Sequence, residues 1–88
     1  MRRNKDYIVR KIAGEVILIP SGGAAARLNG MVSLNELAAF LWEQLKEPRD
    51  LEELIRLVTG EYEVSREEAE KDIREFIARL KEEGMVIN

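Results

Sequence analysis

Residues 31–45 read MVSLNELAAFLWEQL, and this stretch decides the fold because a short strand runs directly into an amphipathic helix. Residues 31–34 favour extended structure, and either Ser33 or Asn35 is suited to cap the helix that follows. The apolar residues after the cap recur with helical spacing and share one face: Leu37, Ala38, Leu41 and Leu45. The stretch therefore predicts a strand–helix unit.

Two β-prone segments precede this unit and predict a hairpin. Residues 7–12 alternate in character, and residues 15–20 (EVILIP) are strongly β-branched. Residues 13–14 (Ala-Gly) lie between the two segments and supply a turn. We therefore expect two antiparallel strands over these two ranges.

The region between the hairpin and the strand–helix unit contains several turn signals. Pro20 and the glycines at 22–23 predict an interruption of the ladder, with a bend or bulge. Residues 29–30 (Asn-Gly) form the strongest two-residue hairpin signal, so residues 24–28 are expected to resume the second strand and to pair with residues 31–34. This would make residues 31–34 the third strand of the sheet.

Two more helices are predicted in the second half of the chain. Asp50, with Glu53 three residues later, marks the start of one helix, which should fray near residues 59–60. Ser65 opens a capping box for a longer helix that ends at Gly84. An apolar strand or tail then follows over residues 85–87. The expected fold class is α+β and winged-helix-like, with an N-terminal three-stranded antiparallel sheet followed by three helices.

Length and composition predict one small domain over residues 1–88, with residues 1–6 as a flexible tail. The chain has no cysteine and no histidine, which removes disulfides, thiolate metal sites and the commonest general base. We therefore expect no enzyme activity, no catalytic residues, no cofactor and no metal. No apolar run is long enough for a membrane span, and the start of the chain lacks the apolar core of a signal peptide, so a cytoplasmic protein without a membrane partner is expected.

Charge is distributed unevenly along the chain. Residues 1–30 carry six basic and two acidic side chains, a net +4, whereas the whole chain has a net charge of −3. This basic half is either simple solvated surface or a surface that attracts an acidic partner. A winged-helix DNA-binding regulator is the alternative function, but residues 65–84 hold five basic against seven acidic groups, which disfavours entry into a DNA groove. We expect no nucleic-acid partner.

The strand–helix unit also carries a family resemblance. Its pattern LN-x-x-A-x-x-(L/I)-W-x-x-L is formed by Leu34, Asn35, Ala38, Leu41, Trp42 and Leu45. This resembles the PqqD-like family, small proteins that bind precursor peptides for peptide-modifying enzymes. Trp42 itself fits a core position at least as well as a ligand contact. The segment PSGGAAARLNG departs from the pyrroloquinoline-quinone prototype, so involvement in that cofactor's synthesis is not expected.

The resemblance implies how the protein binds its partner. A leader peptide would add as a strand at the edge of the third strand, beside the third helix. The implied peptide-binding residues are Met31, Val32, Ser33, Leu34, Ile73, Arg74, Phe76, Ile77 and Leu80. The apolar members of the helix set are either groove or core, and Arg27 and Arg74 are either contacts for an acidic peptide or solvated surface. The implied second partner is a modifying enzyme such as a radical SAM protein or a cyclodehydratase-type enzyme, and an exposed strand edge also permits a homodimer.

Overall fold

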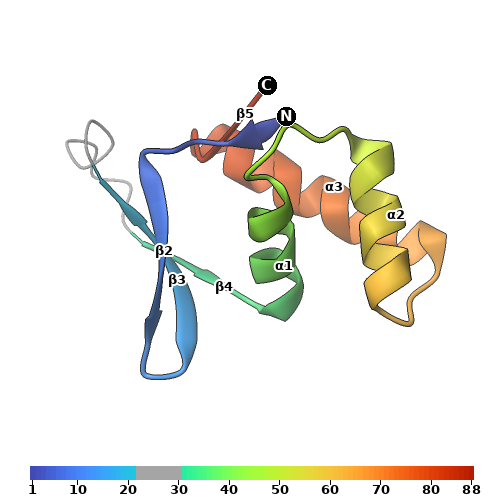
Figure 1. Ribbon diagram of the computed structural model, residues 1–88, viewed down its shortest axis with the longest axis horizontal. Coiled ribbons are helices and arrows are strands. Elements are labelled where there is room, and N and C mark those ends of the chain that lie inside the picture. Colours follow the sequence, from blue (N-terminus) through green and yellow to red (C-terminus); the bar gives the residue numbers. More distant parts are fainter. Residues whose placement is uncertain (22–30) are drawn as a thin grey trace.

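A three-stranded antiparallel sheet and three helices form most of the computed structural model, which describes residues 1–21 and 31–88 (Figure 1). The elements follow the order β1 (Arg2–Arg3), β2 (Tyr7–Ile12), β3 (Glu15–Pro20), β4 (Val32–Leu34), α1 (Glu36–Gln44), α2 (Leu51–Glu61), α3 (Arg66–Glu82) and β5 (Val86–Ile87). The predicted α+β class, with its sheet before its three helices, is confirmed. The likeness to a winged helix is loose.

The hairpin of β2 and β3 has the predicted bounds. Ala13 and Gly14 both have positive φ, 53° and 84°, as a two-residue type I′ turn requires. The register starts at Ile12↔Glu15 beside the turn and ends at Tyr7↔Pro20. The pair beside such a turn exchanges both of its hydrogen bonds, and bonded and non-bonded pairs alternate from there.

This alternation explains why β3 includes Pro20 as its last residue without a break in the pairing with β2. Pro20 faces Tyr7 in a non-hydrogen-bonded pair, so the N–H that proline lacks is not needed by β2. The glycines at 22–23 lie outside the described residues. The predicted bend or bulge is therefore absent at Pro20 itself.

The third strand pairs with β3. Its register is Val16↔Leu34, Ile17↔Ser33 and Leu18↔Val32, which places β3 in the centre of the sheet. The predicted pairing of residues 24–28 with this strand, through a turn at residues 29–30, lies outside the described residues. The pairing with residues 16–18, in the first part of the second strand, was not predicted, because it requires a long connection instead of a tight turn.

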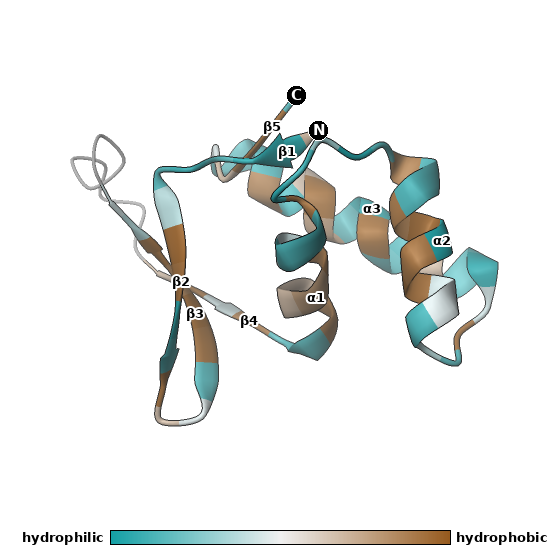
Figure 2. Ribbon diagram, viewed as in Figure 1, coloured by the Kyte–Doolittle hydropathy of each residue, from teal (hydrophilic) through white to brown (hydrophobic). Residues whose placement is uncertain are grey.

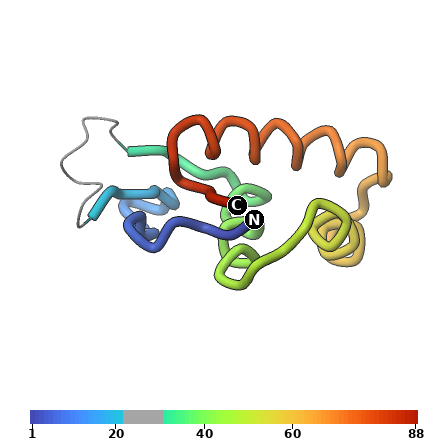
Figure 3. Tube along the Cα trace, turned by 90° about the horizontal axis from the view of Figure 1, so that it is seen from above, coloured from blue at the N-terminus to red at the C-terminus, as the bar shows by residue number. Residues whose placement is uncertain are grey.

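The expectation that residues 1–6 form a flexible tail is not met. Arg2 and Arg3 form β1, which pairs antiparallel with β5, so the two ends of the chain lie side by side (Figures 1 and 3). The Arg3 amide donates to the Leu45 carbonyl at 2.9 Å, and the Met1 amine donates to the Arg49 carbonyl at 2.9 Å. These long-range bonds hold the segment, and local composition gives no signal for them.

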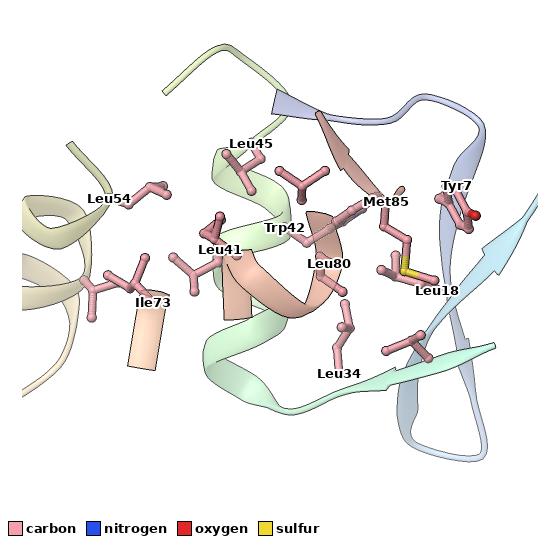
Figure 4. Close-up of a cluster of buried hydrophobic side chains, with 14 of the residues drawn as sticks. Tyr7, Leu18, Leu34, Leu41, Trp42, Leu45, Leu54, Ile73, Leu80 and Met85 are labelled. Atoms are coloured by element: carbon pink, nitrogen blue, oxygen red, sulfur yellow. The ribbon is translucent and has the colours of Figure 1, made fainter. Parts of the chain in front are cut away.

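One hydrophobic core joins the sheet to the helices. Leu18 and Leu34 of the sheet point into the same cluster as Trp42 of α1 and Leu80 of α3 (Figure 4). The brown inner faces and teal outer faces of α2 and α3 in Figure 2 show the amphipathic pattern that this burial requires. Trp42 is 2% exposed, so it is a core residue.

The ends of the helices follow the predicted signals. Asp50 and Glu53 form a complete capping box on α2. At the start of α3, Ser65 accepts from the Glu68 amide at 3.1 Å, but the Glu68 side chain does not bond back to the Ser65 amide, so only half of the predicted capping box forms. Gly84, with φ of 75°, then ends that helix in a conformation that side chains other than glycine rarely adopt. Seen from above, α3 runs along one side of the molecule, with α2 beside its beginning (Figure 3).

Candidate functional site

Strand β4 is one edge of the three-stranded sheet. The hairpin register fixes which of its backbone groups face outward. Ile17 of β3 bonds to β2, so the β3 residues on either side of it bond to β4. Their partners in β4 are Val32 and Leu34, whereas Ser33 directs its N–H and C=O to the outer edge. No described strand pairs with that edge.

Side chains along this edge divide between the core and the surface. Val32 and Leu34 are buried, so the two residues that bond to β3 also pack in the core. Ser33 is exposed, and Met31, just before the strand, is 65% exposed. Of the four strand residues predicted to bind peptide, Met31 and Ser33 are accessible, and Val32 and Leu34 hold the strand in place.

Helix α1 begins directly after this edge strand. The Asn35 side-chain oxygen accepts from the Ala38 amide at 2.8 Å, which identifies Asn35 instead of Ser33 as the cap. Asn35 is extended, with φ of −74° and ψ of 179°, so the chain passes from strand to helix at this residue. The cap therefore fixes the position of the β4 edge relative to the first turn of α1.

A groove runs between this first turn and α3. It has a volume of about 370 Å³ and is lined by Asn35, Leu37, Ala38, Leu41, Asp72, Glu75, Phe76 and Arg79. A second hollow, of about 390 Å³, shares Asn35, Leu37 and Asp72 with it and extends to Tyr62 and Val64. Because they share residues, we treat the two as one α1–α3 groove. It starts at the end of β4 and has an apolar floor with charged walls.

The predicted α3 residues are not all found in this groove. Phe76 lines it and is half-buried. Ile73 and Leu80 are fully buried and Ile77 is nearly so, so all three belong to the core and are closed to a ligand. Arg74 is exposed and pairs with Glu70 at 2.9 Å, away from the groove.

Four charged residues that line the groove were not predicted from the sequence: Glu36 of α1, and Asp72, Glu75 and Arg79 of α3. The three on α3 lie on one helix face. Together with Phe76 they recur at i, i+3, i+4 and i+7, so they form one face of α3 beside its buried stripe. This spacing was visible in the sequence. What the sequence lacked was the identity of the element opposite that face, which is the first turn of α1.

Tyr62, which lines the second hollow, belongs to an aromatic pair. Phe40 and Tyr62 meet edge to face, with ring centroids 5.5 Å apart. Burial, together with the nearby Glu36 and Glu61 carboxylates, raises the pKa of the Tyr62 hydroxyl above its usual value. The hydroxyl therefore stays protonated at neutral pH and remains able to donate a hydrogen bond.

In residues 1–21 and 31–88, no three His, Cys, Asp or Glu side chains converge to hold a metal ion. No helix in those same ranges is long and apolar enough to cross a membrane.

The chain is similar to one protein family and to solved structures. The family described as coenzyme PQQ synthesis protein D (PqqD) matches residues 14–86. A structure of lasso peptide synthetase B1 complexed with the leader peptide is 28% identical, with a TM-score of 0.76, and the match covers 99% of this chain and 96% of that one. A structure of TbiB1 in complex with the TbiA(beta) leader peptide shares the fold at 24% identity, with a TM-score of 0.76, over 97% of this chain and 93% of that one. Among curated proteins, the comparison gives no match.

Proposed function

This chain belongs to the PqqD family, and we propose that it binds the leader region of a ribosomally made precursor peptide and presents it to a modifying enzyme. One observation carries the proposal. The lasso peptide synthetase B1 structure, which matches almost the whole chain at 28% identity, contains a bound leader peptide. Because ribosomes supply the precursor, we place this activity in the cytoplasm.

The leader peptide adds to the sheet as a strand beside β4. Ser33 offers one N–H donor and one C=O acceptor at the open edge. Met31 precedes it by two residues, so an extended backbone directs the N–H and C=O of Met31 to the same edge. Each such main-chain bond contributes about 0.5–1.5 kcal/mol net, so the edge supplies affinity that does not depend on the leader's sequence. The exposed Met31 side chain adds an adaptable apolar contact.

Sequence preference comes from the α1–α3 groove. Leu37 and Phe76 offer apolar surface for a side chain of the leader, since both line the groove and are only half-buried. The charged lining of the groove consists of three acidic residues, Glu36, Asp72 and Glu75, and one cation, Arg79, so its walls carry a net negative charge. A leader with an apolar anchor followed by a basic residue fits this lining best.

Catalysis is left to the partner enzyme. The chain contains no histidine or cysteine, and its perturbed carboxylates are exposed ion-pair partners. A hydrogen bond from Lys46 lowers the pKa of Glu43, and one from Arg66 lowers the pKa of Glu52. Both therefore remain ionised near neutral pH and are unsuited to act as general acids.

The test uses the leader peptide of a precursor encoded beside this chain. Titration into labelled protein should shift the amide signals of residues 31–35 and of the groove residues on α3. Ser33→Ala, which keeps the backbone donor, is the matched control and should bind normally. Shifts confined to other surfaces would contradict the proposal.

A further inference from the structure

The sheet has a second edge, formed by β2. The register that fixes the outward groups of β4 applies here too, since Ile8, Arg10 and Ile12 bond to β3. The N–H and C=O groups of Tyr7, Val9 and Lys11 therefore point away from β3. The Tyr7 amide is already used by the Asn4 carbonyl at 3.1 Å, and the Val9 carbonyl accepts only a 3.3 Å contact from the Arg10 guanidinium. Among residues 1–21 and 31–88, no strand bonds to the outward backbone groups of Val9 and Lys11, which are thus available to another strand.

A cationic hollow lies beside this edge. It has a volume of about 470 Å³, and its charged lining consists of Arg2, Arg3, Lys5 and Lys46, without an acidic lining residue. Arg3 and Lys46 share Glu43 as an ion-pair partner, at 3.8 and 3.0 Å. Arg2 and Lys5 form no ion pair with any described residue. The hollow therefore carries uncompensated positive charge next to unpaired strand groups.

The fold holds part of this charge in a fixed position. The Arg3 guanidinium lies 5.8 Å from the ring centroid of Trp42 and donates to the Trp42 carbonyl at 3.4 Å. Pairing of β1 with β5 fixes the backbone of the same residue. A cation that is already ordered loses little side-chain entropy when an anion binds. Val9, which is 40% exposed, adds apolar surface to the hollow.

Charge decides which kind of strand fits here. A second copy paired through β2 would bring two sets of the basic residues Arg10 and Lys11 onto neighbouring strands, and this accumulation of like charge disfavours such pairing. An acidic strand would instead meet cations along β2 and in the hollow. The opposite edge, β4, has a groove with net negative charge and would repel the same segment.

We propose that the β2 edge and its cationic hollow bind an acidic, extended segment of the modifying enzyme. This rests on the proposed function, because it assigns one sheet edge to the leader and the other to the enzyme that receives it. The order β2-β3-β4 separates the two edges by a full strand, so both partners bind at once without competing. Docking at β2 should weaken as salt rises, since exposed charges are screened.

A short blocked peptide of alternating Glu and Thr is the probe, titrated into labelled full-length chain. Amide signals of residues 2–11 should shift, while those of residues 31–35 should not. Arg2→Ser combined with Lys5→Ser should weaken binding at least about tenfold, equivalent to ~1.4 kcal/mol. Arg56→Ser combined with Lys71→Ser removes the same charge from two exposed helix positions and should leave binding unchanged.

Strand addition is tested separately from simple charge attraction. Val9→Pro removes an outward N–H and should abolish probe binding, whereas Val9→Thr keeps the donor and should bind normally. Leader binding at β4 should persist in every variant, which shows that each is folded. Equal binding of a Lys-Thr peptide, tighter binding of single-stranded DNA at the same residues, or full probe affinity in Val9→Pro would overturn the proposal. A wild-type chain that binds the probe but not the leader would instead refute the proposed function.

Discussion

Proline substitution in β4 separates peptide binding from folding. The register makes Ser33 the strand residue whose N–H faces the open edge, while the Val32 N–H bonds to β3. Ser33→Pro removes one donor from the edge and leaves a leader carbonyl without its partner, a loss of about 1–3 kcal/mol. We expect leader affinity to fall at least about tenfold, or ~1.4 kcal/mol, with little change in stability.

Val32→Pro should act in the opposite way. It removes a ladder bond to β3 and a buried side chain, so the free energy of unfolding should drop by more than the roughly 1–3 kcal/mol of one unsatisfied buried carbonyl. Calorimetry with the leader peptide and urea unfolding measure the two effects, with Ser33→Ala as the control that keeps the N–H. Normal leader affinity in Ser33→Pro, or full stability in Val32→Pro, would refute the register argument.

Three further predictions concern other parts of the chain. Phe76→Ala should weaken leader binding about tenfold with little effect on stability, because Phe76 lines the groove. Ile73→Ala should instead lower the free energy of unfolding by about 2–5 kcal/mol, because its side chain is fully buried. Binding and unfolding are measured for both variants, and the opposite assignment of the two effects would contradict the groove. Ala13→Asn should raise the free energy of unfolding by about 1 kcal/mol, because asparagine tolerates the positive φ of this turn; a decrease in the urea midpoint would count against the type I′ turn. Duplex DNA should show only weak, salt-sensitive attraction to the basic N-terminal segment, and sequence-selective submicromolar binding at physiological salt would revive the DNA-binding alternative.

Local signals predicted much of the fold correctly. The bounds of β2 and β3, the cap at Asn35 and the capping box at Asp50 all depend on residues close together in sequence. The β1–β5 ladder and the pairing of β4 with β3 depend on long-range contacts, which leave no periodic signal. This is why residues 1–6 were expected to be flexible and why the third strand was assigned a nearer partner.

The candidate site residues predicted on α3 do not all line the groove. An apolar stripe shows which side of a helix is buried, and Ile73, Ile77 and Leu80 accordingly occupy the core of α3. A binding groove borders that stripe instead of coinciding with it. The apolar stripe has two sides, and only the packing of α1 against α3 shows that the side containing Phe76 lines the groove.

Amide hydrogen exchange at Ser33 tests the central claim most directly, because this N–H is the donor that faces the open edge of β4. Adding the leader peptide should slow exchange at Ser33, while the already bonded amides of Val32 and Leu34 change little. Unchanged exchange at Ser33 with saturating leader, and new protection at Val9 instead, would contradict strand addition at β4.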